Sequence, residues 1–424
     1  MWDFMQTNEM LTDHSINTTQ SGMRKAYTIF LFILVLIPVF RATVFIRRRS
    51  PLAYSQVDMY NSVQIIITFV MVILLSCRRA IDSNRLMMKG PTFLLLLYTV
   101  FCVMSAIWSS GPIYTAYRAI EVLVTFLFMG HLLYFINNRR KAMIWLCRIA
   151  AMSAFFGYLK LLLQGQIFQH TNSYSTAGAF GAILALACIR NGIFKLSDIK
   201  YTLLICLGTV VFGTSSASNV SLLVGIILII SSTKKQAISG VRLLLVAILT
   251  YFILTTSFYV IMPYVFPGKT IDNIKTGRGR TGLFSMYEKT IYEHPIIGSG
   301  FAVGEREALG PGVNWTHNSL LSVTVNTGMV GLLLFIGGFI SILYSLYRAQ
   351  KIGNEFASPL MIAILVGFLN SMSYPLIGSI WTASTTSFWG LLAYVSIYFH
   401  QERENVSFVP EPFCNYFQSI RRFS

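Results

Sequence analysis

The sequence predicts an all-α fold, that of a polytopic helical membrane protein with about 12 transmembrane helices. Of the 424 residues, 54% are hydrophobic and 12% are charged, whereas soluble domains carry about 25% charged residues. The mean hydropathy is +0.62. Apolar runs close to the length that crosses a bilayer, about 20 residues, recur along most of the chain.

Each predicted helix corresponds to one apolar run. The runs lie roughly at 27–46, 59–77, 91–108, 115–136, 143–163, 173–189, 201–213, 219–232, 242–264, 319–345, 358–376 and 378–398. No soluble domain or low-complexity segment interrupts them, so we interpret 1–424 as a single integral membrane domain. No basic segment followed at once by an apolar one opens the chain, and a cleaved signal peptide is not expected.

The charges between the runs predict the orientation. The net charge is +17, but it is scattered in short groups such as "NNRRK" and "TKKQAISGVR", which is typical of topology determinants and not of nucleic-acid binding. The connections "WSSGP", "QGQIFQHTN" and "TSSAS" carry no Lys or Arg. The positive-inside rule therefore places the even-numbered connections in the cytoplasm and the odd-numbered ones outside. The "RRR" at Arg47 to Arg49 is an exception.

The longest connection, 266–318, is odd-numbered and should be a long periplasmic loop. Within it, "TGLFSMYEKTIYEHPIIGSGF" places Leu283, Phe284, Tyr287 and Ile291 at helical spacing before a Pro and Gly-rich turn. This pattern predicts a short amphipathic helix at the outer membrane–water boundary.

Metals and cofactors are not expected. The six cysteines have no C-x-x-C spacing, and five of them lie in or beside apolar runs, which is typical of small core residues. The outward connections contain no D-x-D or E-x-x-H pattern.

Unusual polar residues gather in the outward connections: Trp108, His170, Asn172, Ser216, Arg278, Arg280, His317 and Asn318. Guanidinium groups bind phosphate oxygens with a bidentate fork, and imidazole accepts a proton near neutral pH. Together they suit a transfer reaction on a phosphorylated, membrane-held substrate. The alternative is structural: interfacial arginines also bind lipid headgroups, and Arg118 is expected to pair with Glu121 at i, i+3.

These residues carry a resemblance to a known family. "THNSLLSVTVNTGMVGLLLFIGG" resembles the His-Asn motif and following Gly-x-x-Gly span of the O-antigen ligase and polysaccharide polymerase superfamily (Wzy/WaaL-like). "GRTGLFSMYEKTIYEHPIIGSGF" resembles the family's Gly-Arg and Pro-x-x-Gly-x-Gly passage. "SAIWSSGPIYTAYRAIEVLVTFLF" and "FQHTNSYSTAGAFGAILAL" are weaker matches. The resemblance covers roughly 100 to 345.

The resemblance implies a metal-independent, inverting glycosyltransferase of the GT-C-like class. It would take a glycan from undecaprenyl pyrophosphate at the periplasmic face of the inner membrane and pass it to a hydroxyl. By position, Arg280, with Arg278 beside it, would hold the pyrophosphate, and His317 would be the base that Asn318 orients. His170, Asn172, Ser216 and Trp108 are possible substrate-binding residues. The chain lacks two family cations, in "TSSASNVS" and in His170-Thr171-Asn172.

Four functions remain open at this point, one of them that of a purely structural membrane partner. The leading one is polymerisation of lipid-linked repeat units into exopolysaccharide, with membrane lipids as partners and a chain-length regulator and export proteins as candidate partners. The second is an O-antigen ligase that transfers polysaccharide to a lipid A core. The third is a transporter, which would be expected to show several intramembrane charges and an internal repeat; Arg118 and Glu121 are the main intramembrane charges.

Overall fold

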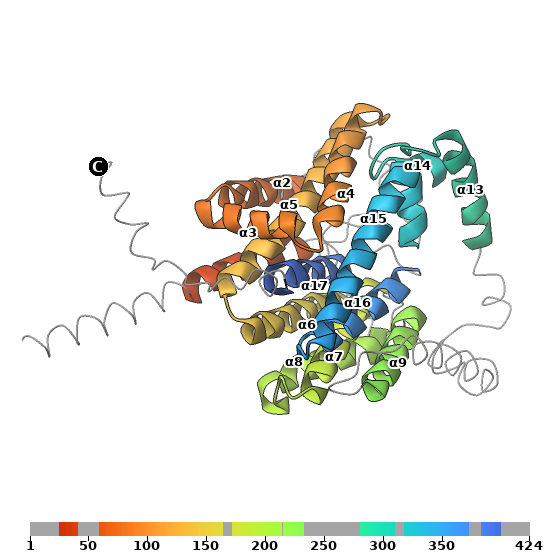
Figure 1. The fold of residues 1–424 in the computed structure, drawn as a ribbon. Helices are drawn as coiled ribbons and strands as arrows, with labels where there is room; N and C mark the ends of the chain where they lie inside the picture. The colour runs from red at the N-terminus through yellow and green to blue at the C-terminus, as the bar shows by residue number, and fades with distance from the viewer. Residues whose placement is uncertain are drawn as a thin grey trace, which may run out of the picture.

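The computed structural model describes residues 25–40, 59–163, 172–213, 215–232, 280–309, 318–372 and 383–399, and every regular element in them is a helix (Figure 1). The helices are Lys25–Phe40, α2 (Met59–Leu75), α3 (Arg78–Lys89), α4 (Phe93–Met104), η1 (Ser105–Ile107), α5 (Pro112–Ile136), α6 (Arg139–Leu163), α7 (Asn172–Arg190), α8 (Leu196–Gly213), α9 (Ser216–Ser231), α13 (Arg280–Glu293), α14 (Gly304–Leu309), α15 (Ser319–Lys351), α16 (Ala357–Ser371) and α17 (Ala383–Phe399). Within the described residues, each predicted apolar run coincides with a helix; the run 242–264 and the ends of three others, 41–46, 373–376 and 378–382, lie outside them.

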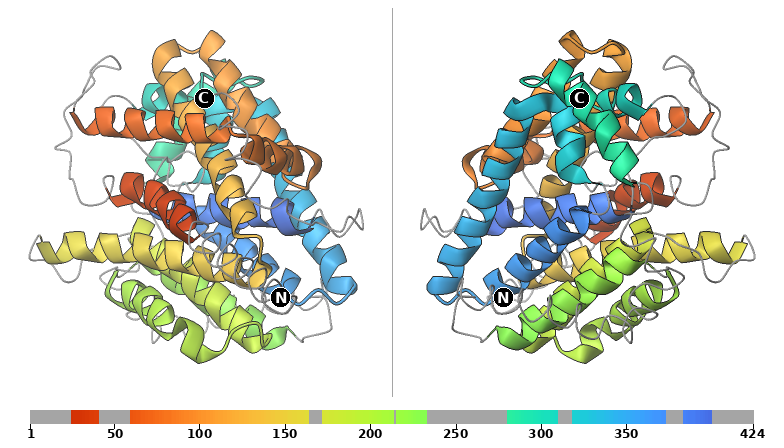
Figure 2. Two further views of the ribbon diagram at one scale, coloured as in Figure 1. Left: turned by 90° about the vertical axis from the view of Figure 1, so that its left-hand side faces the viewer. Right: turned by 90° about the vertical axis from the view of Figure 1, so that its right-hand side faces the viewer.

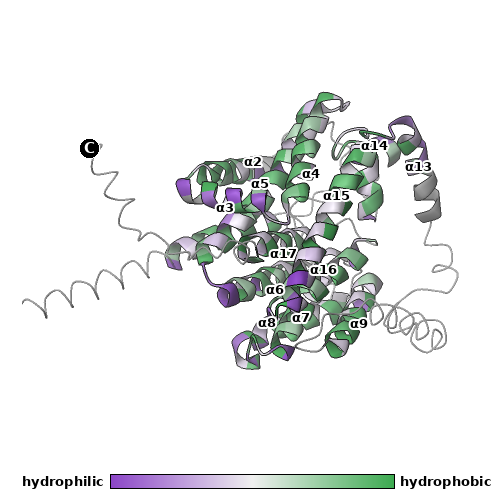
Figure 3. Cartoon of the chain, viewed as in Figure 1, coloured by the Kyte–Doolittle hydropathy of each residue, from purple (hydrophilic) through white to green (hydrophobic). Residues whose placement is uncertain are grey.

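Several of these helices qualify as membrane spans by length and composition. Among the described residues, five are long and apolar enough, or up to six if the bent pair α2 and α3 is one span. Figure 3 shows hydrophobic residues along most helices, with hydrophilic ones on α3, α13 and at helix ends. Large apolar side chains such as Phe69 and Leu204, 64% and 69% exposed, face outward as lipid contacts require. The chain is therefore a polytopic helical membrane protein.

The prediction was wrong for the basic segment after the second run. We predicted a connecting loop, but 78–89 form helix α3, bent by 87° from α2. Ala80, Ser83 and Met87 are buried on one face, while Arg85 and Lys89 are exposed on another. This spacing of three and four residues is that of an amphipathic helix, and the high charge of the segment obscured it.

The interior of the bundle is built around α7 and α17. Helix α17 crosses the middle of the bundle (Figure 2), and every described side chain on it is buried. The ring centre of Trp389 lies 4.7 Å from that of Phe126 on α5. Helix α7 packs closely on α8 through glycines: a Cβ at Gly178 would lie 2.2 Å from the Thr209 hydroxyl, and one at Gly181 would lie 2.5 Å from the Cys206 sulfur. Small residues allow membrane helices to approach in this way.

The helix ends form two groups. At one end, which we call the basic end, contacts join the start of α6, the start of α8, the α15–α16 connection and α17: Arg140 Nη2 to Asp198 Oδ2 (2.7 Å), Asn191 Nδ2 to the Glu355 carbonyl (3.2 Å) and Tyr394 Oη to the Arg139 carbonyl (3.1 Å). The other end, which we call the α13 end, carries α13, α14 and the start of α15. The basic connections described thus share one end, as their charge pattern predicted.

Candidate functional site

The centre of the α13 end is a break in α15. Gly328 has φ 62° and ψ −162°, which divides the helix into 319–327 and 329–351. Figure 1 shows the two halves pointing in different directions. We predicted one uninterrupted run over 319–345, and this part of the prediction was wrong. A glycine adopts the left-handed region without a Cβ penalty, and its own sequence context does not reveal which of its conformations is used.

The segment 295–300 closes this break. Ser299 N and Gly300 N donate to the carbonyls of Val325 (3.1 Å) and Asn326 (2.9 Å), at the end of the first half-helix. In return, the amides of 329 and 330 donate to the carbonyls of 295 and 296, at 2.9 and 3.1 Å. The backbone groups freed by the break are therefore satisfied inside the protein, as a membrane requires. The Pro-x-x-Gly-x-Gly and Gly-x-x-Gly passages are two parts of one joint.

The Trp-Ser passage is the third part of this joint. The Phe301 amide donates to Ser105 Oγ (2.9 Å), and Thr115 Oγ1 donates to the Phe301 carbonyl (3.1 Å). A Cβ on Gly300, whose φ is +108°, would lie 2.5 Å from the Ser109 side chain. Trp108 lies beside these residues, and its indole N–H is buried without a hydrogen-bond partner among the described residues.

The predicted base and its neighbours are only partly described. Asn318 is half-buried and caps α15: its Oδ1 accepts from the amides of Leu320 (2.9 Å) and Leu321 (3.2 Å). Arg280 is the first residue of α13 and Asn172 the first of α7. The side chains of these two residues lie outside the described residues, as do all atoms of three other candidates: His170, Arg278 and His317.

Ser216 begins α9 in the interior of the bundle. It is 3% exposed, and its Oγ has no hydrogen-bond partner among the described residues. The preceding Ser215 caps the helix by accepting from the Ser218 amide. Ser216 is therefore a buried hydroxyl whose hydrogen bonding the described fold does not use.

A helix, α13, does precede the Pro-x-x-Gly-x-Gly passage; its place at the membrane–water boundary stays a prediction. Tyr287 is fully buried against the neighbouring elements, whereas Met286 and Tyr292 are 51% and 77% exposed. Burial raises the pKa of the Tyr287 phenol above its ordinary value, and the nearby negative charge of Glu305 raises it further. The side chains of Leu283 and Phe284 lie outside the described residues.

The predicted ion pair in the fourth run is also confirmed. Arg118 Nη1 lies 2.8 Å from Glu121 Oε2. The other carboxylate oxygen of Glu121, which is fully buried, accepts from the Tyr117 hydroxyl at 2.6 Å and from Gln64 Nε2. A buried carboxylate with three donors is a satisfied structural group.

This pair extends toward the α13 end through residues that the sequence analysis missed. Arg306 of α14 donates to the Tyr114 hydroxyl (2.6 Å), and its guanidinium carbon lies 4.3 Å from the centre of that ring. Arg118 Nε donates to the same hydroxyl at 3.3 Å. Two guanidinium groups therefore meet at one phenol. The spacing of four between Tyr114 and Arg118 was a usable signal, but Arg306 stood in a mixed-charge run that predicts only a solvated surface.

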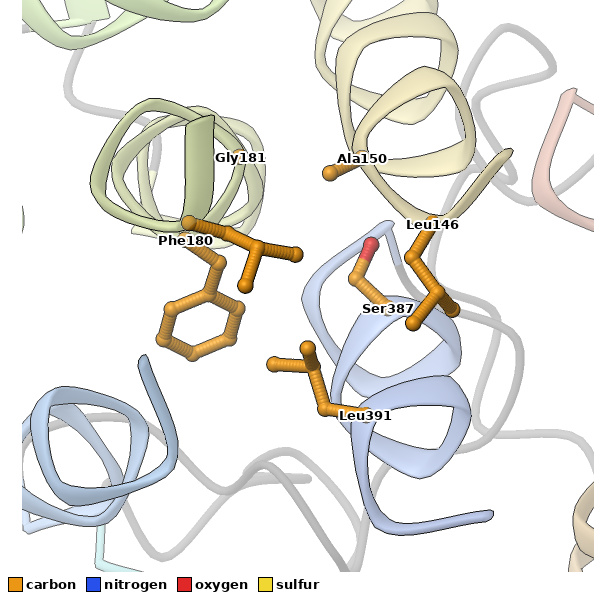
Figure 4. A pocket seen from close by; sticks show the side chains of 7 residues that line it. Leu146, Ala150, Phe180, Gly181, Ser387 and Leu391 are labelled. Carbon is orange, nitrogen blue, oxygen red and sulfur yellow. The ribbon is translucent and has the colours of Figure 1, made fainter. Parts of the chain in front are cut away.

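No metal centre is evident in the part of the chain that is described. No group of three or more His, Cys, Asp or Glu could hold a metal ion there. A small cavity between α6, α7 and α17 is shown in Figure 4, and of its seven lining residues only Ser387 has a polar side chain. This cavity is a packing space in the core.

Comparison with known proteins shows which family part of the chain resembles. A search of curated proteins gives no match to the chain. A family model described as O-antigen ligase matches residues 201–336. The matched segment includes most of α8, all of α9, α13 and α14, and the break in α15 with the segment that closes it. The resemblance of this chain to the O-antigen ligase and Wzy-like superfamily is therefore confirmed over residues 201–336.

Proposed function

We propose that this protein polymerises undecaprenyl-pyrophosphate-linked oligosaccharide repeat units into exopolysaccharide at the periplasmic face of the inner membrane. The family match supports a membrane glycosyltransferase-like enzyme that acts on lipid-linked polysaccharide. The choice of a polymerase rests on the resemblance of the His170-Thr171-Asn172 passage to polymerases.

The joint between 295–300 and the break in α15 is the observation that carries the proposal. It fixes α13, which begins with Arg280, against the half-helix that follows His317. A phosphate-binding residue and a base thus come from two elements that one set of backbone hydrogen bonds holds together. A reaction on a membrane-held diphosphate needs this combination in a rigid frame.

Each step can be assigned to residues. Arg280, with Arg278, holds the pyrophosphate, and the guanidinium pair of Arg306 and Arg118 adds positive charge at the same end. His317 takes the proton from the acceptor hydroxyl, whose oxygen bonds to the anomeric carbon. The bond from that carbon to the pyrophosphate oxygen breaks, so the configuration inverts and no metal is required.

The neutral polar groups fit a role in binding the sugars. The buried Ser216 hydroxyl and the Trp108 indole N–H have no hydrogen-bond partner among the described residues, and uncharged donors of this kind fix the orientation of neutral ligands. His170 and Asn172 belong to the same outward connections. Asn318 uses its Oδ1 on the backbone of α15, so we assign it to holding the turn that follows His317.

The proposed function also requires an orientation of the helix bundle in the membrane. We propose about twelve spans, with the basic end in the cytoplasm and the α13 end in the periplasm. The long connection 266–318 then lies outside, with α13 at the membrane–water boundary. A chain-length regulator and export proteins would meet the product at that face.

The test is turnover by the purified protein in liposomes that contain lipid-linked repeat units. We expect polymer to form in the presence of EDTA, and His317→Gln to lower turnover by about 10²–10⁴-fold, because an amide cannot accept the proton. Asn314→Gln, in the same connection, is the control. Near-normal turnover of His317→Gln would remove the base from the mechanism, and inhibition of the unmutated protein by EDTA would contradict the metal-free reaction.

The alternatives give different products in the same assay. Liposomes supplied with both repeat units and lipid A core separate them. Transfer to the core without chain extension indicates a ligase. Movement of lipid-linked glycan between leaflets without a new glycosidic bond indicates a transporter.

A further inference from the structure

Helix α3 presents three cations on one exposed stripe. Arg78, Arg85 and Lys89 are all exposed, and spacings of seven and four residues place them one above another along the helix (Figure 3). None of the three forms an ion pair with another described residue. Asp82, which is half-buried, lies in the same stripe. Three positive charges against one negative charge give the stripe a net charge of +2.

An apolar stripe runs beside the basic one. Ile81 and Met88 are 43% and 54% exposed, and they lie roughly a fifth of a turn from the cations. The buried side chains of α3, Ala80, Ser83 and Met87, occupy the opposite side of the helix. A helix that exposes apolar and basic residues side by side is suited to a membrane surface. Its apolar side chains enter the acyl region, and its cations stay among the headgroups.

The bend before α3 orients this helix along the membrane. Every exposed side chain described on α2 is apolar: Val63, Ile65, Ile66, Phe69, Val72 and Ile73. Helix α2 therefore has the surface of an element that lies in lipid. Helix α3 is turned by 87° from it. A helix nearly perpendicular to a spanning helix lies along the bilayer surface, where its charges avoid the hydrocarbon.

Contacts with α5 and α17 hold the buried side of α3. A Cβ at Gly130 of α5 would lie 2.2 Å from Met87 Sδ, so the two helices are in close contact. Just after α3, the Thr92 amide donates to Ser396 Oγ of α17 at 3.3 Å. Ser396 lies two residues from Tyr394, whose hydroxyl makes one of the contacts of the basic end. Helix α3 therefore belongs to the basic end, with its basic stripe turned away from the bundle.

We propose that the exposed face of α3 binds the headgroups of anionic phospholipids in the leaflet at the basic end. The guanidinium groups of Arg78 and Arg85 donate to phosphate oxygens, and Lys89 adds a point charge. A zwitterionic headgroup also offers a phosphate, but its own cation cancels the attraction. A cation near an anionic surface strengthens binding on the order of fivefold. The inference is independent of the proposed glycosyl transfer, which takes place at the α13 end.

The test measures which lipid lies against α3 in the full-length protein. Four native cysteines are buried, so Cys77→Ser and Cys414→Ser leave Met88→Cys as the site for an apolar bimane fluorophore. The protein is placed in phosphatidylcholine liposomes that contain nitroxide-labelled phosphatidylglycerol or nitroxide-labelled phosphatidylcholine. Quenching at equal mole fractions gives the relative association of the two lipids. We expect phosphatidylglycerol to be favoured about fivefold or more at low salt.

Two triple variants locate this preference. Arg78→Gln, Arg85→Gln and Lys89→Gln together remove the basic stripe and should bring the preference close to unity. The matched control removes three exposed cations of the same end that lie outside α3: Lys141→Gln, Arg190→Gln and Lys195→Gln. This control should keep the preference, because the attraction at α3 is local.

Salt provides a measurement that needs no charge variant. Raising the salt from about 0.05 M to about 1 M shortens the Debye length to about 3 Å and should remove most of the preference. Equal association of the two lipids at low salt, or a preference that salt leaves unchanged, overturns the proposal. An equal loss in both triple variants also overturns it, because the attraction would then belong to the whole basic end. If the α3 triple variant does not insert, Arg85→Gln alone should lower the preference, and an unchanged value contradicts the role of the stripe.

Discussion

At the residue scale, Asn318 shows how a neighbour of the proposed base acquires a structural task. The sequence predicts that it orients His317, because the two residues are adjacent. The structure places its Oδ1 on the amides of Leu320 and Leu321. A side chain that caps a helix fixes the turn it begins, so Asn318 fixes the first turn of α15. Adjacency in the sequence suggested a role for Asn318, but it could not predict that the side-chain oxygen bonds to the backbone of α15.

Replacing this cap separates its two possible roles. Asn318→Ala removes the acceptor and should lower the stability of the folded protein by about 0.5–2 kcal/mol, together with turnover. Asn318→Asp keeps an acceptor for the same amides and should retain the stability. Thermal unfolding in detergent and turnover in liposomes measure the two effects. An unchanged midpoint for Asn318→Ala would show that the cap does not hold this turn.

The proposed role of Arg280 is tested by comparing its planar guanidinium group with the single ammonium charge of a lysine. Hydrogen bonds to charged groups contribute about 1.5–3 kcal/mol each. Arg280→Ala should therefore lower turnover by a factor of roughly ten to a few hundred, or more. Arg280→Lys should restore it only in part, because an ammonium group cannot form a planar bidentate contact.

The control for Arg280 lies on the same helix. Lys289 is exposed and 3.9 Å from Glu293, an arrangement of little energetic consequence, so Lys289→Ala should leave turnover unchanged. If Arg280→Ala and Arg278→Ala both leave polymer yield unchanged, the phosphate role of this pair is wrong.

At the scale of elements, most of the described helices were predictable, whereas α3 and the joint were not. Local spacing predicts α13, because the buried Tyr287 and the exposed Tyr292 follow a helical period. The pairing of 295–300 with 325–330 is non-local, and its backbone hydrogen bonds leave no side-chain pattern. Glycines were the one visible sign, and a glycine does not reveal its partner. Helix α3 was missed for a different reason: its many charged residues suggested a loop, although its apolar residues recur at helical spacing.

The joint predicts an unusual sensitivity at Gly328. A Cβ there would lie 2.4 Å from the backbone of Ile296, and φ is +62°. Gly328→Ala should therefore combine backbone strain with a clash that cannot relax, and the yield of folded protein should fall severely. Gly353 is the matched control, since its φ is +85° but nothing lies within 4 Å of a Cβ. Its change to Ala should cost only the strain, about 1–2 kcal/mol.

Monodispersity and the thermal midpoint of the purified variants measure the difference between these two glycines. A loss for Gly328→Ala no larger than that for Gly353→Ala would mean that 295–300 can move away from α15, and that the joint is not rigid.

At the scale of the whole molecule, hydropathy predicted the class and charge predicted the grouping of helix ends. The arrangement of the helices could not be predicted, because the sequences of α7 and α17 show no preferred apolar face. The candidate site was likewise predictable only in part. Its motifs were visible in the sequence, but Glu305, Arg306 and Tyr114 enter it only because α14 folds back onto α5 and α15.

The orientation of the bundle follows from this grouping and can be measured directly. Ser110, at the α13 end, and Lys141, at the basic end, are both exposed. Asn314 and Lys234 lie in the connections that the charge pattern assigns to the outside and the inside. Four of the native cysteines are buried and Cys77 is half-buried, so a background in which Cys77 and Cys414 are serine is suitable for single-cysteine labelling. In cells with a permeable outer membrane, an impermeant reagent should label cysteines at 110 and 314. Those at 141 and 234 should react only after the inner membrane is opened. Labelling of all four in intact cells would contradict the shared face of the site residues. The reverse pattern would keep that shared face but place it in the cytoplasm, where a periplasmic polymerase could not work.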